Sequence, residues 1–192
     1  MASSSLVDNG ILDGRRMTLE EYLATPETNK RFELTYGTLR EPAAPSWDHQ
    51  LIVGRLFRQL DDHVTRLGLG RVGLSPLDVV LDEARQLVVQ PDLVFVAEER
   101  VHIIRDRIWG APDLVVEVES LGCRFYDRRD KNGWYRECGV REQWVVSPVE
   151  KAIEIYDLTK PAGRPARFTS KEVVRSAVLP RLRLRVGRLF AD

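Results

Sequence analysis

The sequence predicts a mixed α/β fold in which helices flank a central mixed β-sheet, with a helix and a hairpin at the N-terminal end. Three observations predict it. The stretch from Trp47 to Leu67 repeats apolar residues at helical spacing. Near-continuous apolar runs at 87–97 and 113–119 are typical of central strands covered on both faces. Helices and strands do not alternate regularly along the chain, which argues against a repeated βαβ unit.

The elements follow from local signals. Thr18 and Glu21 form a capping-box pattern, which predicts a first helix. Residues 31–41 indicate two short strands around a turn at Gly37. Ser46 is the expected N-cap of the long helix. The remaining expected elements are strands at 72–81, 87–97 and 113–119, a helix at 127–138, a strand pair at 143–147 and 152–156, and an edge strand at 182–186.

Length and composition limit the class of protein. The chain has 192 residues, of which 43% are hydrophobic and 30% charged, as in one globular domain. We expect a flexible leader at 1–16 and a single domain at 17–192. No apolar stretch reaches the roughly 18 residues of a membrane span, the N-terminus lacks a signal-peptide pattern, and two cysteines do not make a disulfide framework. The expected location is the cytoplasm, without a membrane partner.

Charge is unevenly distributed although the formal net charge is zero. Zero net charge argues against a strong non-specific nucleic-acid binder. From Lys160 onward, however, nine Lys or Arg residues stand against two acids. Arg181, Arg183 and Arg185 alternate with apolar residues and would share one face of the expected edge strand. This face is a candidate nucleic-acid-binding surface, and a solvated sheet edge is the alternative.

Two apparent motifs do not support a function. Residues 68–73 match G-x-G-x-x-G in letters, but a helix precedes them and a strand follows. A dinucleotide-binding loop requires the opposite order. The three histidines, at 49, 63 and 102, lack metal-ligand spacing. We expect His63 at the surface near the end of the long helix.

Carboxylates inside apolar strands are the most informative feature. Asp92 and Glu117 each lie within an expected central strand. A buried carboxylate is costly unless it is paired or binds a cation, and two on adjacent strands could share one ion. Each could instead be capped at a strand end by a backbone amide or an arginine. With Glu33 available from the hairpin, we favour a site. Carboxylates without His or Cys favour Mg²⁺ or Mn²⁺ over zinc.

A metal held by carboxylates suits a phosphate substrate. Phosphate oxygens complete the coordination of such a metal, which also activates water. A nearby lysine would stabilise the charge that develops during the reaction. Because no lysine occurs between Pro91 and Asp130, Lys131 in the expected helix after the Glu117 strand is the candidate.

An ordered set of residues resembles a known family. Pro91-Asp92, a later acidic strand and a nearby lysine resemble the PD-(D/E)XK nuclease superfamily. The chain resembles the Uma-two (Uma2) family of restriction-endonuclease-like proteins more closely, over roughly residues 17–190. The matching pieces are Met17–Leu23, Phe32–Leu34 with Gly37, His49, Gln90–Val94, Gly110–Val118 with Ser120, Asp127 with Lys131 and Tyr135, Gly139-Val140 with Glu142 and Trp144, and Leu179–Phe190.

The resemblance implies a restriction-endonuclease-like fold and Mg²⁺-dependent hydrolysis of phosphodiester bonds in DNA. It places the metal between Asp92 and Glu117, and the carbonyl of Val118 is a further candidate ligand. Glu33 would be an additional catalytic carboxylate that holds a second metal or a water. The usual lysine two places after the glutamate is absent, and in this family it is supplied from the following helix, which points to Lys131.

Three more residues are candidate accessory groups. Glu119 stands at the usual lysine position and shares a strand face with Glu117, so it would add either repulsion or a ligand at the metal. His49 could bind phosphate or orient a water, or bond a backbone carbonyl at the helix start. Tyr135 shares a helical face with Lys131, and would either hydrogen-bond the site or pack in the core.

Two functions therefore remain open, because a third, a metal enzyme that processes sugars or nucleotides, has no support in the sequence beyond the acids. The first is a Mg²⁺- or Mn²⁺-dependent DNA endonuclease. Because cutting both strands needs two active sites, this function predicts a two-fold homodimer. The second is a catalytically inactive protein that keeps the nuclease fold as a nucleic-acid-binding or protein-interaction module. Zero net charge and Glu119 favour the second function slightly, and retention of the charged positions favours the first.

Overall fold

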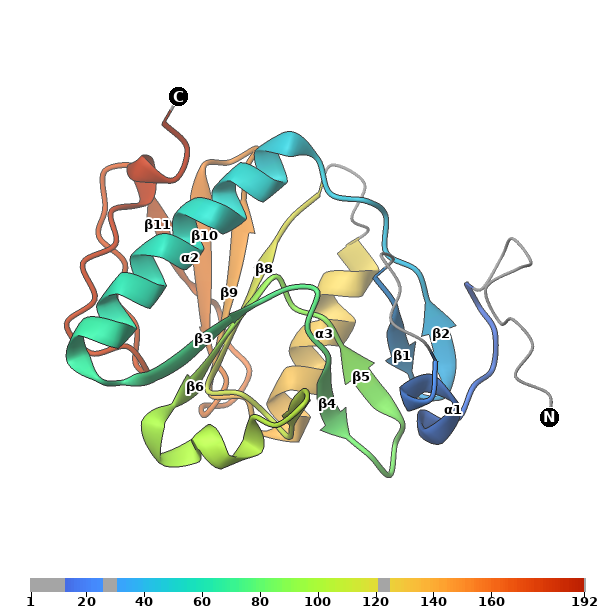
Figure 1. Ribbon diagram of the computed structural model, residues 1–192. Helices are drawn as coiled ribbons and strands as arrows, with labels where there is room; N and C mark the ends of the chain where they lie inside the picture. The colour runs from blue at the N-terminus through green and yellow to red at the C-terminus, as the bar shows by residue number, and fades with distance from the viewer. Residues whose placement is uncertain (1–12, 26–30, 121–124, 192) are drawn as a thin grey trace.

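A computed structural model describes residues 13–25, 31–120 and 125–191, without the side chains of 125–129. It contains two mixed β-sheets flanked by helices (Figure 1). The expected α/β class is confirmed, with a second sheet beside the expected central one. Within the described ranges, no helix has both the length and the apolar character needed to cross a bilayer.

The larger sheet has six strands. They are β3 (Gly70–Leu74), β6 (Leu93–Ala97), β8 (Leu114–Val118), β9 (Glu142–Ser147), β10 (Ala152–Asp157) and β11 (Ala166–Thr169). Their order is β11-β10-β9-β8-β6-β3, and only β8 and β9 pair in parallel. Two parallel neighbours need a crossover connection, and α3 (Phe125–Cys138) provides it. This helix begins two residues before the expected start.

The smaller sheet has five strands. They are β1 (Glu33–Thr35), β2 (Thr38–Arg40), β4 (Val79–Asp82), β5 (Leu87–Val89) and β7 (Ile108–Trp109), in the order β2-β1-β5-β4-β7. The single strands expected at 72–81 and 87–97 are each two strands, and at both places the chain passes from one sheet to the other. Pro76 and Pro91 stand at these crossings. A proline has no N–H to continue a ladder, so each crossing has a local cause.

The first two helices start and end as expected. The capping box of Thr18 and Glu21 opens α1 (Leu19–Leu23). In α2 (Trp47–Leu67), the backbone N–H of His49 donates to Oγ of Ser46 at 3.3 Å. Gly68 ends α2 in the left-handed region with φ of +63°, a conformation that glycine adopts without steric cost.

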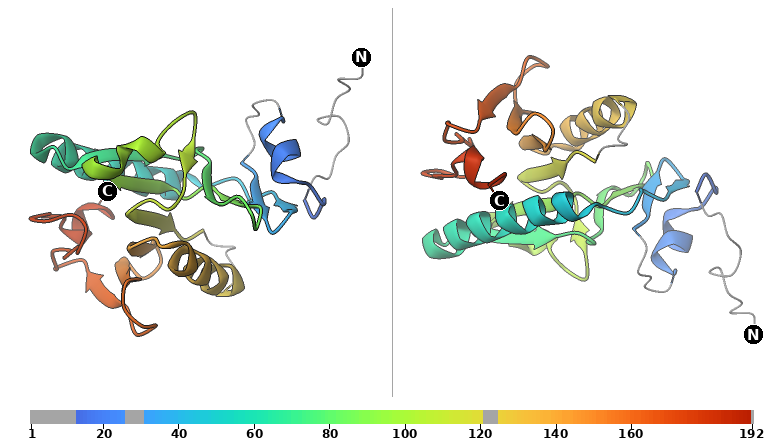
Figure 2. Two further views of the ribbon diagram at one scale, coloured as in Figure 1. Left: turned by 90° about the horizontal axis from the view of Figure 1, so that it is seen from below. Right: turned by 90° about the horizontal axis from the view of Figure 1, so that it is seen from above.

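The core is layered. On one face of the six-stranded sheet, α2 and the C-terminal segment pack together. The five-stranded sheet and α3 cover the other face, while α1 lies on the outer side of the five-stranded sheet (Figure 2). Residues 13–16 run beside β2, where the N–H of Gly14 donates to the carbonyl of Leu39 at 2.8 Å. A single domain from residue 17 onward stays a prediction.

The edge strand expected at 182–186 is wrong. Leu182, Leu184 and Val186 are buried between exposed arginines, so the two-residue period is real. Apart from one isolated bridge between Val173 and Arg185, however, this segment forms no ladder. Its apolar side chains instead enter the core beside α2, and a short 3-10 helix, η2 (Val186–Arg188), follows. An extended segment on a core surface gives the same alternation as a strand.

The glycines of residues 68–73 have structural roles. Gly70 has φ of +145°, and a Cβ there would lie 2.0 Å from the carbonyl oxygen of Val96. Only glycine allows this close approach between β3 and β6. Together with the helix end at Gly68, this explains the glycine pattern without a nucleotide.

Candidate active site

A buried lysine joins two carboxylates from different elements. Glu33 lies on β1, Glu117 on β8 and Lys131 on α3. Nζ of Lys131 lies 2.9 Å from Oε1 of Glu33 and 3.2 Å from Oε1 of Glu117. Lys131 is only 9% exposed. The structure therefore brings three of the four expected catalytic residues into direct contact.

Asp92, the fourth, lies immediately before β6, which pairs with β8. Leu93 pairs with Val116 in this ladder, so the two expected acidic strands are neighbours. One carboxylate oxygen, Oδ2, accepts a hydrogen bond from the N–H of Val118 at 2.8 Å and lies 3.2 Å from Nε2 of His49. The other oxygen, Oδ1, accepts from Nη1 of Arg31 at 3.1 Å. Three separate segments thus hold this carboxylate.

Asp92 and Glu117 have opposite electrostatic surroundings. Burial acts to raise the pKa of Asp92, but the hydrogen bond and charge of His49, the amide of Val118 and Arg31 hold that pKa below its ordinary value. Burial raises the pKa of Glu117, the charge of Lys131 lowers it, the charges of Asp92 and Glu33 raise it, and the hydroxyl of Tyr135 lowers it, so that together they set it at about 7. One carboxylate is therefore ionised at neutral pH, and the other is balanced between its two forms.

The three accessory candidates have defined places. The hydroxyl of Tyr135 donates to Oε1 of Glu117 at 2.5 Å, and the ring is fully buried. Tyr135 therefore both packs and bonds to the site. His49 contacts the carboxylate of Asp92 rather than a backbone carbonyl. Glu119 is half-buried just beyond β8, with its backbone N–H donating to Val146.

Unused hydrogen-bonding capacity gathers around Asp92. Within the described ranges, four buried side-chain atoms have no hydrogen-bond partner: Nε of Arg31, Nδ1 of His49, Oγ of Ser75 and Oε1 of Gln90. Arg31 and His49 contact the Asp92 carboxylate, the N–H of Ser75 donates to its carbonyl at 3.1 Å, and Gln90 is two residues before it. Buried polar atoms are nearly always bonded, so this concentration marks a place suited to a polar ligand.

The donor chemistry of the site suits a hard cation. In the part of the chain that the structure describes, no three His, Cys, Asp or Glu side chains are gathered as a ready metal site. Lys131 lies between two carboxylates instead. The negative charges of Asp92 and Glu33 nevertheless act together on Glu117, and a divalent cation relieves this kind of repulsion. Carboxylate and carbonyl oxygens are ligands of Mg²⁺ and Mn²⁺, so these residues fit either ion.

Sequence reasoning missed two residues that support the site. Arg31 pairs with Asp92 and donates to the carbonyl of Gln90. The N–H of Gln90 donates to Oε1 of Glu33 at 3.0 Å, and its side chain to Asp78. Each lies two residues before an acid of the site, and the two-residue period of extended chain is the signal that could have revealed them.

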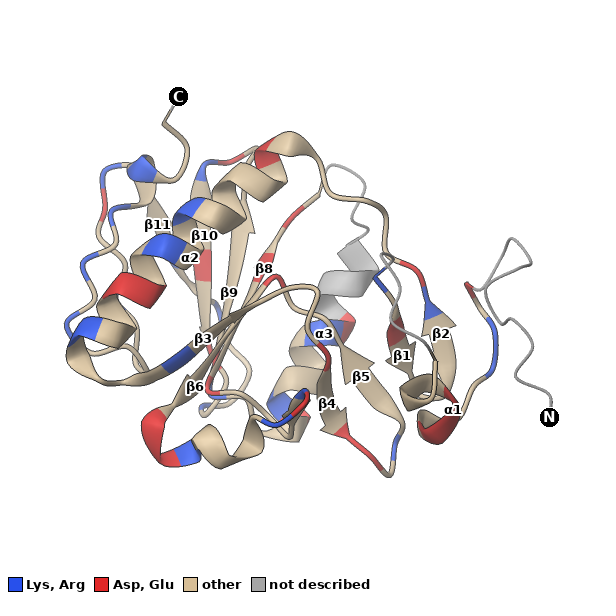
Figure 3. Ribbon diagram, viewed as in Figure 1, with Lys and Arg blue, Asp and Glu red and all other residues tan. Residues whose placement is uncertain are grey.

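The basic C-terminal residues lie away from this cluster. Arg181, Arg183 and Arg185 are all exposed, on the segment that packs beside α2 rather than near the β1–β2 hairpin (Figure 3). His63 is buried, with Nε2 3.0 Å from the carbonyl of Pro180, so its expected surface position is wrong. It attaches this segment to α2.

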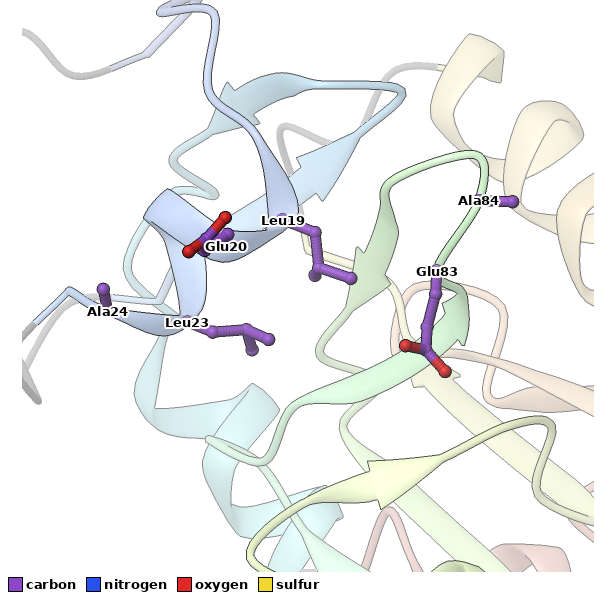
Figure 4. A pocket seen from close by; sticks show the side chains of 6 residues that line it. All are labelled: Leu19, Glu20, Leu23, Ala24, Glu83 and Ala84. Atoms are coloured by element: carbon purple, nitrogen blue, oxygen red, sulfur yellow. The ribbon is translucent and has the colours of Figure 1, made fainter.

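A shallow, open depression lies elsewhere, between α1 and the turn that joins β4 to β5 (Figure 4). Its lining residues are Leu19, Glu20, Leu23, Ala24, Glu83 and Ala84. None of the expected site residues borders it, and its lining combines aliphatic side chains with the carboxylates of Glu20 and Glu83.

Comparisons with known proteins agree with the fold. A family model named Uma2, described as "putative restriction endonuclease", matches residues 19–187. Among solved structures, the chain is similar to the crystal structure of a putative nuclease belonging to DUF820 from Anabaena variabilis ATCC 29413. That match has 20% identity and a TM-score of 0.78, and covers 91% of this chain and 97% of the other. No curated protein matches.

Proposed function

Since the chain belongs to the Uma2 family of putative restriction endonucleases, we propose that it is a metal-dependent nuclease that hydrolyses phosphodiester bonds of DNA. The observation that carries this proposal is the convergence of Glu33, Asp92 and Glu117 around Lys131 and Arg31. Two buried acids and a partly buried one, with two cations, are costly as a structural device alone. They are useful where a charged substrate and a cation bind.

Each residue has a proposed role. Asp92 and Glu117, with the carbonyl of Val118, would hold Mg²⁺ or Mn²⁺, which when bound supplies an activated water and polarises a phosphate oxygen. Asp92 is ionised at neutral pH because its three donors favour the carboxylate. Lys131 would stabilise the negative charge that develops on the phosphate. Glu33 keeps the ammonium group in position and is itself fixed by the N–H of Gln90.

Two further features of the proposal concern assembly and affinity. Arg181, Arg183 and Arg185 would contact DNA phosphates, so binding should weaken steeply as salt rises. Replacing all three by glutamine should reduce that salt dependence, and wild-type affinity in the triple variant would contradict the role. Cleavage of both strands would use a two-fold homodimer. Sedimentation of the metal-loaded protein tests that state.

The test of activity uses the full chain. Wild-type protein with Mg²⁺ or Mn²⁺ should cut DNA, and calorimetry should show binding of the metal alone. Asp92→Ala should abolish both. Metal binding that is unchanged in Asp92→Ala would contradict the metal site proposed at Asp92 and Glu117. A wild-type protein that cuts no nucleic acid with either ion would contradict the nuclease function.

One observation favours a second candidate. Arg31 and Lys131 already pair with the site acids, so the cluster is partly compensated without an ion. This would suit an inactive nuclease-fold module that binds nucleic acid or protein. Nucleic-acid binding that is independent of metal and is never followed by cleavage would support that candidate.

A further inference from the structure

An exposed row of residues runs along α2. Trp47, Leu51, Gly54 and Arg58 are spaced at four, three and four residues, so they share one face of the helix. Trp47 is 80% exposed and Leu51 37% exposed, while Gly54 and Arg58 are also exposed. We call these four residues the α2 row. Tryptophan side chains are usually largely buried. Large apolar groups that lie next to one another on a surface commonly mark contact sites.

The α2 row begins at the candidate active site. Trp47 is the first residue of α2, and His49 in the same turn contacts Asp92 at 3.2 Å. Only two residues, or about 3 Å along the helix axis, separate them. The side chain of Trp47 lies roughly 160° around the helix from that of His49, so it faces solvent rather than the carboxylates. A strand bound at Asp92 would reach this ring by passing around the N-terminal end of α2.

The charges near the row suit a polyanion. The N-terminus of a helix carries partial positive charge, and Arg58 ends the row with a full one. Nη1 of Arg55 donates to the carbonyl of Leu189 at 2.9 Å, which brings the basic C-terminal segment alongside α2, with Arg188 next in sequence to that contact. Asp48 is exposed in the first turn, and Asp62, four residues after Arg58, lies on the same helix face, so the positive charge beside the row comes from Arg58 and the C-terminal segment rather than from α2 as a whole.

We propose that the α2 row is a stacking platform for unpaired bases of the nucleic acid whose backbone reaches the Asp92 site. This inference rests on the proposed function. Proteins that bind single-stranded nucleic acid combine exposed aromatic rings, on which bases stack, with cations that contact the backbone. Stacking does not depend on sequence, because every base has a π-face. Gly54 leaves space between the apolar and the basic ends, since a Cβ there would meet nothing within 4 Å.

The test measures binding without cleavage. A short single-stranded DNA and an abasic strand of the same length are titrated against the full chain in chelator, so that catalysis plays no part. Stacking is worth about 1–3 kcal/mol per base, so Trp47→Ala should weaken binding of the normal strand roughly 5- to 100-fold. Trp47→Phe should retain much of the affinity. The abasic strand should bind wild type and Trp47→Ala equally.

Val149→Ala is the matched control, because Val149 is 73% exposed in the turn between β9 and β10, and this variant should bind as wild type does.

Equal weakening for both strands would overturn stacking, and so would unchanged binding of the normal strand by Trp47→Ala. A wild-type dimer that Trp47→Ala converts to monomer, with unchanged DNA affinity, would assign the row to self-association. Base-dependent binding without any cleavage would leave the platform standing and remove the nuclease function, whereas cleavage with wild-type binding in Trp47→Ala would remove the platform alone.

Discussion

Asp92 lies immediately before β6 and Glu117 on the neighbouring β8, yet their surroundings differ. Asp92 receives hydrogen bonds or charge from Arg31, His49 and the N–H of Val118. Glu117 receives the hydroxyl of Tyr135 and shares Lys131 with Glu33. The first carboxyl has a lowered pKa, and the second has one raised to about 7. Burial acts on both, so the difference comes from the donors around Asp92 and from the negative charges of Asp92 and Glu33 that act on Glu117.

This contrast gives the two acids different tasks. A carboxyl that is ionised at all physiological pH values can hold a cation or orient a phosphate-binding group at once. A carboxyl balanced near neutrality can release its proton when a cation arrives, or take one up. If the proposed cation binds here, its binding would therefore be coupled to release of a proton from Glu117 to solvent.

Neutralising the Asp92 carboxylate should have the largest effect on stability. Asp92→Asn leaves Arg31 and His49 facing a neutral amide, which should lower the free energy of unfolding by about 3–5 kcal/mol in urea denaturation at pH 7. Asp113→Asn is the matched control, because Asp113 is fully buried and pairs with Arg100 and Arg141. Both variants should lose similar stability, and only Asp92→Asn should lose metal binding. Loss of metal binding in both would show that stability alone explains it.

Removing the ammonium group of Lys131, which Glu33 and Glu117 share, should have the next largest effect. Lys131→Ala should lower the cleavage rate by roughly 10²–10³-fold, as for the loss of one preorganised charge contact. Because Lys131 is buried between two acids, this variant should also lose stability, so rates are compared at a temperature where both proteins are folded. Lys151→Asn removes an exposed charge at a residue with φ of +48°, which asparagine tolerates, and should cut as wild type does. A Lys131→Ala protein as active as wild type would exclude the lysine.

The sequence predicted most of the residues on which these effects depend. Glu33, Asp92, Glu117 and Lys131 were all expected at one site, and the long helix was expected at its observed bounds, because capping residues and apolar period are local signals. Arg31 was missed because its partner is 61 residues away in sequence. The passage of the chain between two sheets was missed because an apolar run looks the same whether one strand or two carry it. The last segment alternates like a strand, but only tertiary packing decides whether it finds a partner.

The pH dependence of stability should separate the two acids. Glu117 ionises less readily in the folded protein than in the unfolded chain, where its pKa is near 4.5. The folded state therefore binds more protons between about pH 4.5 and 7, and its stability should fall as pH rises through this window, by at most about 3 kcal/mol. Glu117→Gln should remove this decline in metal-free urea denaturation. A wild-type curve that is flat from pH 5 to 8, and parallel to that of Glu117→Gln, would mean that Glu117 is not perturbed.

The smallest change tests the hydroxyl that contacts Glu117. Tyr135→Phe keeps the buried ring but removes the donor 2.5 Å from Oε1. That bond favours the ionised carboxylate, so its loss should move the pKa of Glu117 above about 7 and cost about 1 kcal/mol of stability. A carboxyl ¹³C NMR titration, with Glu117 assigned from Glu117→Gln, measures the shift. If ionised Glu117 is needed for the cation, the pH at which cleavage reaches half its maximum should rise with it.

Tyr22→Phe is the matched control for that variant. Its hydroxyl, which is also part of the core, contacts Asp78 and the carbonyl of Phe32 instead of Glu117. It should lose a similar amount of stability and leave the titration of Glu117 unchanged. An equal shift in both variants would trace the perturbation to general loosening of the core, and no shift in Tyr135→Phe would leave burial and Lys131 as the groups that set the pKa. A shift in Tyr135→Phe alone would show that one hydroxyl adjusts the proton affinity of Glu117 while Asp92 keeps its own donors.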